Sequence, residues 1–423
     1  MPSDVEVQFF SHLNGLKLDN NWGDLIRLLD TCLVNGLPLT VSDTAIDEQG
    51  DIYLTTSTAH NCLLFQIIEL SGFEPEDING KYRIKGIPAT NQLILKAEHL
   101  GQSIYTIGET KLASLGYEII FRDTADVKRV YRAKNPKENH PYIRVDESIS
   151  SDTGSYTSTY AKFAMVGLLE NMTHIDDYNN PDVLQLPFDP TNPAKNWIIN
   201  GTGTAVVRGW SRWYWARGTG TVTDPAMDSA TPTTGGRAFT LIGDIDAFYL
   251  VRNVDATKTN GLKSILCCGL YHSVLKNDVI PNWFLGTILT SNTVSVNFNL
   301  TSSIDGSLPL AYTNNTSKLY VCNFNEITRI SNHILCDLLV PDYGSGYSGI
   351  YGANNIAALE IPLADTNKYL RGTLKHIYYN GKALNIKNIT PYLADKSMYI
   401  ADGIYINGAG NVGSPIFYLG EIE

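Results

Sequence analysis

The stretch GWSRWYWARG, residues 209–218, holds three of the six tryptophans in a chain of 423 residues. Side chains alternate between the two faces of a β-strand, so Trp210 and Tyr214 would share one face, and Trp213 and Trp215 the other. A sugar-binding surface would normally carry its aromatic rings on one exposed face. Rings on both faces instead predict a strand buried on both sides, between two layers or at a subunit contact.

The composition favours a β-rich protein of several domains. The chain is long enough for more than one core, 43% of its residues are hydrophobic, and Tyr alone occurs 24 times. Only 18% of the residues are charged, and the net charge is −11. Proteins that hold DNA or RNA by the phosphates usually present a basic face, so we expect no nucleic-acid partner.

The lack of a recognisable signal peptide and the pattern of cysteines both argue against secretion. The sequence begins MPSDVEVQFF, which lacks the regions of a signal peptide, and no apolar run is as long as a membrane span. We therefore expect a soluble protein, made in the cytoplasm, that does not insert into membranes. The six cysteines form no CxxC pair and are expected to be buried free thiols: Cys32, Cys62, Cys267, Cys268, Cys322 and Cys336.

One helix is predicted near the start, in NWGDLIRLLDTCLVNG, residues 21–36. Asn21 is the expected N-cap, Asp24 suits the positive N-terminal end, and Gly36 is the expected stop. Five residues fall on one apolar stripe: Leu25, Leu28, Leu29, Cys32 and Leu33.

Strand patterns dominate the rest of the chain. RAFTLIGDIDAFYLVRNV, residues 237–254, predicts two strands around a turn near GDID, and NTVSVNFNLTSS, residues 292–303, alternates as a half-buried strand does. AKFAMVGLLENM, residues 161–172, fits either a strand or a helix. Residues 217–236 and 341–355 are rich in Gly, Pro, Thr, Ser or Asp and predict surface loops that are suited to contacts.

These patterns predict a mainly β, multi-domain protein, sandwich-like or barrel-like, with few helices. We divide it into an N-terminal segment with the helix (1–40), a small inserted β module (41–105), a central β domain (106–260) and a C-terminal β domain (261–423).

No motif for a metal, a cofactor or a catalytic nucleophile is present. No two histidines are four residues apart, the Gly-rich stretches lack a following Lys-Ser or Lys-Thr, and GYSGI at 346–350 misses the GxSxG pattern. We therefore predict no enzyme activity and no catalytic, cofactor-binding or metal-binding residue.

Two weaker alternatives remain open. Asp176, Asp177 and Asp189 could serve as the acid and base of a polysaccharide-degrading tailspike, although turns commonly select Asp for local hydrogen bonds. The three tryptophans of residues 209–218 could instead form a sugar-binding site.

Five segments occur in the order seen in a family of tailed-bacteriophage virion proteins. They are LIRLLDTCLVNGL (25–37), AHNCLLFQIIELSGFEPEDINGKYRI (59–84), VYRAKNPKENHPYIRVDES (130–148), AKFAMVGLLENMTHIDD (161–177), and WYWARG (213–218) with GGRAFTLIGDIDAFYLV (235–251). The chain departs from the pattern at Ala216-Arg217, where Lys-Ser is usual, and at Arg237-Ala238-Phe239, where Arg-Pro-Trp is usual. The resemblance covers residues 22–260 and is vaguer afterwards.

The chain is most similar to the non-contractile tail sheath of short-tailed phages that carry a giant virion RNA polymerase. This resemblance implies a structural protein of the virion tail, assembled in the host cytoplasm as a homo-oligomeric ring of six-fold or three-fold symmetry. It further implies contacts with other tail proteins and, through exposed loops, with a host outer-membrane receptor. The family carries no catalytic motif that could be transferred to this chain.

Overall fold

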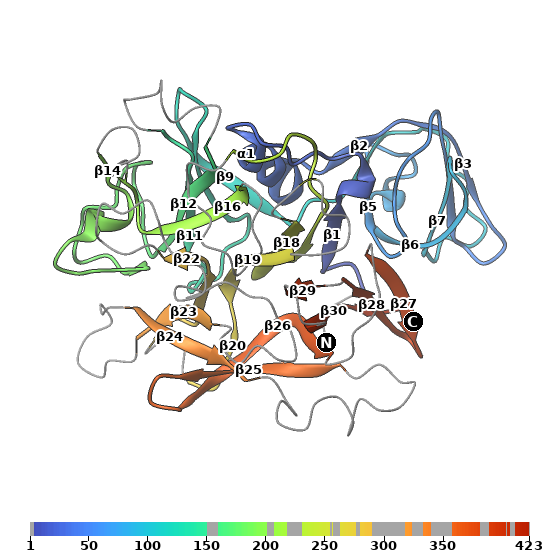
Figure 1. Ribbon diagram of the computed structural model, residues 1–423. Coiled ribbons are helices and arrows are strands. Elements are labelled where there is room, and N and C mark those ends of the chain that lie inside the picture. Colours follow the sequence, from blue (N-terminus) through green and yellow to red (C-terminus); the bar gives the residue numbers. More distant parts are fainter. Residues whose placement is uncertain are drawn as a thin grey trace.

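The computed structural model describes residues 4–149, 160–200, 207–217, 231–253, 256, 263–275, 280–289, 318–323, 333–339, 358–380, 389–402, 404–406 and 411–422. Within these residues the protein is mainly β with few helices, as the sequence predicts (Figure 1). The predicted strand at 292–303 and the loop at 341–355 lie outside the described residues, as does most of the loop at 217–236.

The largest sheet joins strands from both ends of the chain. Its order is β1 (Gln8–Ser11), β17 (Phe239–Gly243), β18 (Ala247–Asn253), β19 (Lys263–Leu270), β21 (Trp283–Gly286), β23 (Lys318–Cys322), β24 (His333–Leu338), β25 (Leu359–Asp365), β26 (Leu370–Asn380), β30 (Asn411–Glu421), β28 (Ser397–Ala401) and β27 (Thr390–Ala394). Two further strands pair at its side, β20 (His272–Ser273) with β26 and β29 (Ile404–Ile406) with β30. The sheet is antiparallel, and β1 therefore fixes the N-terminal segment to the hairpin of β17 and β18.

A second antiparallel sheet packs against this one. Its order is β22 (Ile288–Leu289), β16 (Ser211–Ala216), β12 (Lys162–Leu169), β11 (Tyr142–Asp146), β10 (Lys128–Ala133) and β9 (Tyr117–Arg122), and β13 (Gln185–Leu186) pairs with β12. Two short strands, β14 (Ile199–Asn200) and β15 (Val207–Arg208), form a separate pair. The segment at 161–172, which fitted either a strand or a helix, is thus the central strand β12, and all eight of its residues are buried.

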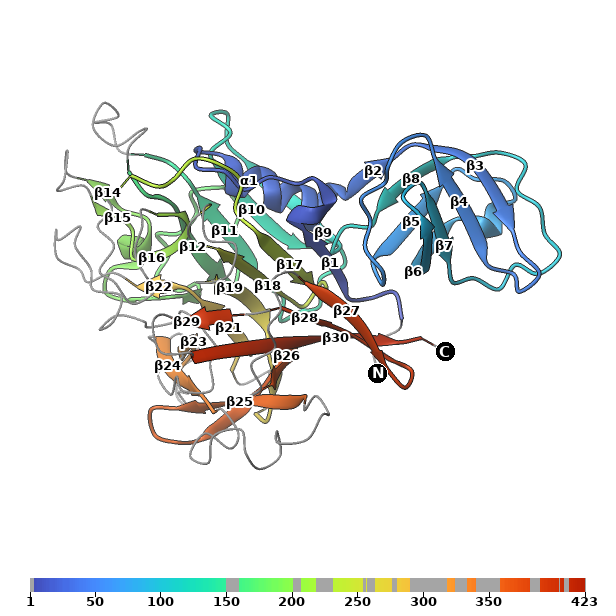
Figure 2. The same cartoon turned by 45° about the vertical axis from the view of Figure 1, so that its right-hand side comes forward.

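A third sheet forms a small module to one side of the other two (Figures 1 and 2). Its order is β2 (Leu37–Leu39), β8 (Glu109–Leu112), β5 (Ile67–Ser71), β6 (Gly80–Ala89), β7 (Gln92–Leu95), β4 (Ile52–Thr56) and β3 (Val41–Ile46). Arg83 of β6 joins the module to both ends of the chain, because its guanidinium donates to backbone carbonyls of Val7 and Leu419 (3.0 and 3.1 Å). The domain boundaries drawn from the sequence remain predictions.

The aromatic strand β16 confirms the prediction that both of its faces are buried. All six of its residues are buried; Trp213 and Trp215 belong to the core between the two large sheets, and Tyr214 to a cluster on the opposite face. The Trp213 ring meets Phe248 of β18 edge to face, with 6.0 Å between centroids, and its Nε1 donates to the carbonyl of Gly286 (2.9 Å). The tryptophans therefore hold the two sheets together.

The predicted helix forms, but it begins later and winds differently than expected. Helix α1 covers Asp24–Leu29 and continues as a π-helix, η2 (Asp30–Asn35), that ends at Gly36 with a positive φ of 74°. The N-cap is Gly23, not Asn21; the backbone N–H of Asn21 instead donates to Asp24 (2.8 Å). Short 3₁₀ helices occur elsewhere in the described residues: η1 (His12–Asn14), η3 (Glu76–Ile78) and η4 (Pro193–Asn196).

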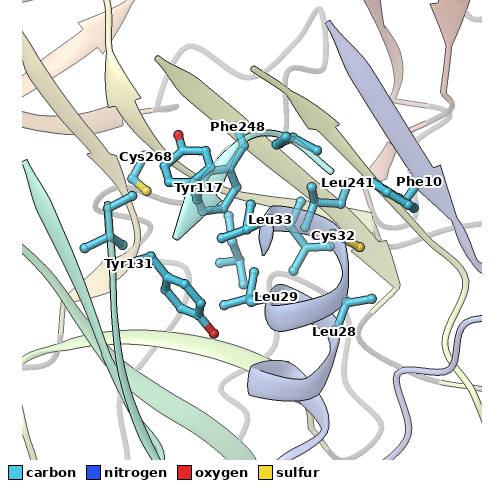
Figure 3. Close-up of a cluster of buried hydrophobic side chains, with 14 of the residues drawn as sticks. Phe10, Leu28, Leu29, Cys32, Leu33, Tyr117, Tyr131, Leu241, Phe248 and Cys268 are labelled. Carbon is cyan, nitrogen blue, oxygen red and sulfur yellow. The ribbon is translucent and has the colours of Figure 1, made fainter. Parts of the chain in front are cut away.

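The apolar stripe of this helix is placed as predicted. All five of its residues are buried in the main core. Figure 3 shows Leu29, Leu33 and Cys32 pointing toward Tyr131, Tyr117 and Leu241, which belong to both large sheets. All six cysteines are buried free thiols, as expected, and Cys267 and Cys268 lie in different clusters because neighbours on a strand face opposite ways.

A carboxylate from a distant segment takes the place of the missing N-cap side chain. Glu147, which follows β11, accepts hydrogen bonds from the backbone N–H groups of Gly23 and Ile26, the latter at 2.9 Å. Its side chain is buried, and this burial raises its pKa to about 7, although the two backbone hydrogen bonds and nearby Arg208 act to lower it. The helix start is therefore tied to the sheet by a group that titrates near neutral pH.

The raised pKa of Glu147 predicts a loss of stability as the pH rises. Its favourable contribution is complete below the unfolded-state pKa of 4.5 and is lost as the pH rises through about 7. We expect the fall over this range to be about 3 kcal/mol in the free energy of unfolding, and Glu147→Gln to abolish most of it. Urea unfolding at several pH values measures this, with Glu138→Gln at an exposed site as the control. If the free energy of unfolding changed with pH in the same way for the wild type and Glu147→Gln, the prediction would be wrong.

The inter-sheet role of Trp213 also predicts a large effect. Trp213→Ala removes a fully buried ring and leaves the Gly286 carbonyl without its donor. We expect the free energy of unfolding to fall by about 3–5 kcal/mol. Tyr105, whose side chain is 80% exposed, provides the control, because Tyr105→Ala should leave the unfolding midpoint in urea nearly unchanged.

Candidate functional site

A polar cleft of about 610 Å³ opens beside the turn between β17 and β18. Its lining comes from segments far apart in the sequence, namely Lys137, Glu138, Asn139, Glu170, Asp246, Leu270, Tyr271, His272, Ser273, Pro281, Asn282, Trp283 and Lys375. Clefts where several segments present polar groups together are the usual places for ligands.

The turn at the base of the cleft is built by its own aspartates. The Asp244 side chain accepts the backbone N–H groups of Asp246 (2.8 Å) and Ala247 (3.0 Å), which is the local bonding that selects Asp at turns. The turn also reaches β19, because the backbone N–H of Leu270 donates to the carbonyl of Asp246 (2.8 Å). The sequence predicted this turn correctly but gave it no further role.

Strand β26 changes its register opposite this turn and directs two basic side chains at it. Its pairing with β25 passes from Pro362–Thr373 to Glu360–Tyr378, so extra residues bulge out of β26. His376 lies in this bulge with a φ of 62°, and its Nε2 is 2.9 Å from Asp244. The neighbouring ammonium of Lys375 donates to Asp246. Bulges commonly redirect side chains toward sites in this way.

A third segment reaches the turn through His140, in the loop between β10 and β11. Its Nδ1 accepts the backbone N–H of Lys137 (2.9 Å), and its Nε2 lies 2.6 Å from Asp246. A ring that accepts at Nδ1 carries its proton on Nε2, so His140 donates to the carboxylate. Both ring nitrogens are in use, and this histidine therefore positions the loop.

The carboxylates of the turn are held in the ionised form. Burial acts to raise the pKa of Asp246, but the hydrogen bonds from His140 and Lys375 and the charge of Lys375 outweigh it, and the pKa lies well below its usual range. The pKa of Asp244 is lowered as well, because His376 outweighs the effect of its burial. Burial, with Lys375 and His376 nearby, also lowers the pKa of His272, a further residue of the lining.

This arrangement suits binding better than catalysis. The charged groups at the base of the cleft are tied to one another, and Trp283 is fixed by a hydrogen bond from its Nε1 to the carbonyl of Asn139 (2.7 Å). The accessible rim offers an ammonium, carboxylates and an imidazole on Lys137, Glu138, Glu170 and His272. These groups can donate to and accept from a hydroxylated or charged ligand.

The three carboxylates considered as catalytic candidates have local structural partners. Asp176 pairs with Lys128 (2.9 Å) and Arg144 (2.6 Å), and these two cations lower its pKa although burial acts to raise it. Asp177 closes a turn by accepting the backbone N–H of Thr173 (2.9 Å). Neither Asp176 nor Asp177 belongs to the lining of the polar cleft.

Asp189, the third candidate, is likewise engaged and lies outside the lining of the cleft. It accepts hydrogen bonds from Lys195 (2.9 Å) and from the Thr191 hydroxyl (2.7 Å), and these bonds lower its pKa. The geometry gives these aspartates roles in turns and ion pairs, as the composition of their segment suggests.

The three tryptophans do not form an exposed platform. Trp213 and Trp215 are fully buried, and Trp210 is only partly exposed. The ring of Trp210 is covered by the ammonium of Lys195 at 4.2 Å and by His333 at 4.6 Å. The aromatic stretch is therefore part of the core.

Among the described residues, no group of three or more His, Cys, Asp or Glu side chains is arranged to hold a metal ion. Within the same part of the chain, no helix has the length and apolar character needed to cross a membrane.

The sequence could not single out the cleft, because its key partners are remote. His140 and Lys375 are separated from Asp246 by 106 and 129 positions. The only local signal is the GDID turn, and Asp is common in any turn.

Comparison with known proteins identifies no relative. No protein family and no curated protein matches the sequence. Among solved structures, the phage phi92 endosialidase is similar at 9% identity and a TM-score of 0.16, over 91% of this chain and 52% of that chain. This chain thus spans about half the length of that protein. Similarity at this level establishes neither a shared fold nor a shared function.

The ion pairs of Asp246 predict a pH-dependent stabilisation. Because its pKa is lowered on folding, its contribution is complete above about pH 4 and is lost as the pH falls below that value. Asp246→Asn should lower the free energy of unfolding at pH 7 by about 3 kcal/mol, and by less at pH 3. Urea unfolding at both pH values tests this against Asp43→Asn, an exposed control; an equal effect of Asp246→Asn at both would contradict it.

Proposed function

We propose that this chain is a structural virion protein of a bacteriophage tail, which forms a non-contractile sheath or ring around the tail tube. In this role it assembles with copies of itself and with other tail proteins, and exposed loops contact a host receptor. The proposal rests on the resemblance of residues 22–260 to the tail-protein family, and one structural observation supports it.

That observation is the common core of the family-like segments. They are spread over more than two hundred positions, yet each contributes to one continuous hydrophobic cluster. Leu29 comes from the helix, Tyr131 and Val166 from the second sheet, and Trp213 and Leu241 from the interface between the sheets. Segments that jointly build one core are expected to be retained together when a fold is shared.

A second feature fits assembly into a ring. Several large apolar side chains are exposed near the hairpin of β25 and β26: Val274, Leu339, Tyr369 and Leu370. Backbone hydrogen bonds join their segments to this hairpin, because Val274 N–H donates to the Arg371 carbonyl (3.0 Å) and Leu339 N–H to the Pro362 carbonyl (2.9 Å). Gathered exposed apolar residues commonly mark contacts between proteins. We call these four residues the apolar tip.

The ring proposal predicts that the purified protein forms closed homo-oligomers. Light scattering at increasing concentration and electron microscopy of negatively stained particles measure this. Tyr369→Ser with Leu370→Ser should shift the population to smaller species without changing the melting temperature, whereas Leu393→Ser, at an exposed site on β27, should not. A wild type that stays monomeric at high concentration, and that is absent from purified virions, would overturn the proposal.

The polar cleft favours a second candidate function, a tailspike-type protein that binds polysaccharide. Its rim carries both hydrogen-bond donors and acceptors, as recognition of sugar hydroxyls requires. Binding of host polysaccharide, followed by calorimetry and weakened by Glu170→Gln, would favour this candidate; release of reducing sugar would show that the polysaccharide is also cleaved.

A further inference from the structure

The layer between the two large sheets changes from apolar to cationic at one end. On β18, alternate residues Phe248, Leu250 and Arg252 face β16. Trp213 of β16 meets Phe248 with 6.0 Å between ring centroids. Arg217 lies four residues after Trp213, and its positive charge lowers the pKa of Arg252. The guanidinium of Arg252 therefore occupies a position that continues the apolar core.

Arg252 is completely buried and lacks the partners that such a group requires. It has no exposed surface, and none of its three guanidinium nitrogens has a hydrogen-bond partner. Burial and the neighbouring Arg217 and Arg237 all disfavour its charge and lower its pKa, while no described carboxylate acts on it. Since an arginine side chain is not readily deprotonated, the positive charge remains to be compensated.

Another fully buried arginine of the same fold has partners for its whole guanidinium group. Arg83 is equally inaccessible, and its guanidinium donates to four backbone carbonyls, those of Asp4, Val7, Phe65 and Leu419. Other buried arginines leave some nitrogens without a partner, but Arg144, Arg208 and Arg371 each keep at least one hydrogen bond, whereas Arg252 has none.

A second buried donor without a partner lies on the same face of β16. Trp215 stands between Trp213 and Arg217 in the alternation of that strand, and its Nε1 is buried with no hydrogen-bond partner. Lys162, which is paired with Ala216, is also buried, and burial with nearby Arg237 and Arg208 lowers its pKa to about 8. This end of the layer is thus rich in donors and positive charge.

The Arg252 guanidinium and the Trp215 indole N–H, which lack acceptors, call for an anion that carries several acceptor oxygens. Guanidinium groups bind phosphate and carboxylate oxygens through paired, charge-assisted hydrogen bonds. We infer that the cationic end of the inter-sheet layer, centred on Arg252 with Arg217 and Arg237 beside it, is a binding site for a small oxyanion such as inorganic phosphate. This inference does not depend on the proposed role in a phage tail.

The site can be tested by refolding, since a buried anion exchanges slowly. The full chain is unfolded in guanidinium chloride, refolded with radiolabelled phosphate and desalted. We expect the refolded wild type to retain phosphate in a fixed ratio to protein, and its melting temperature to rise with phosphate beyond the rise in sodium chloride of equal ionic strength. No retained phosphate would overturn the inference.

Variants separate the site from general stabilisation by phosphate, which many proteins show. Arg252→Met should retain no phosphate and respond to phosphate and chloride alike, and in phosphate-free buffer it should melt no lower than the wild type, because an uncompensated charge is gone. Arg83→Met, the matched control, should melt lower in every buffer and still retain phosphate. Should Arg252→Met fail to fold, Arg252→Gln takes its place, and retention of phosphate by Arg252→Gln at the wild-type level would overturn the inference.

Discussion

The packing of Trp213 against Phe248 joins the two large sheets, and most of the structure depends on this layer. Each sheet is antiparallel and could face water on one side, but together they bury β12, β16, β17 and β18 on both faces. The helix α1 and its π-helical extension fill the remaining opening with an apolar stripe. Once this layer is closed, polar groups within it have to find their partners inside the protein.

The buried charges follow from this constraint. Arg83 donates to carbonyls from both ends of the chain, Glu147 accepts from the start of the helix, and Asp246 receives His140 and Lys375. Each of these groups connects segments that are distant in sequence, so each also specifies which segments lie together. Arg252 differs, because none of its guanidinium nitrogens has a partner, and we therefore propose that an external anion binds there.

A scaffold of this kind is consistent with a protein that acts by assembly and contact. The tryptophans of β16 and the ion pairs of Asp246 are used internally, and the polar cleft and the apolar tip are accessible features of the described residues. They suit different kinds of contact, because the cleft suits a hydroxylated or charged molecule and the apolar tip suits another protein surface. The tail-sheath role that we propose would use both kinds of contact, one with a neighbour in the ring and one with a host surface.

The sequence by itself determined the local structure. The alternation of aromatic residues at 209–218 gave a strand buried on both faces, the spacing of Leu25 to Leu33 gave the buried stripe of the helix, and GDID gave a turn, because all three patterns depend on neighbours only a few positions away. Tertiary structure alone decided that Glu147 caps the helix in place of Asn21, and that the segment at 161–172 contains strand β12 and no helix. It also decided that His140 and Lys375 meet Asp246, and that Arg252 is buried without a partner. These outcomes depend on contacts between segments that are distant in the sequence, and local patterns do not show which aspartate or arginine those contacts will involve.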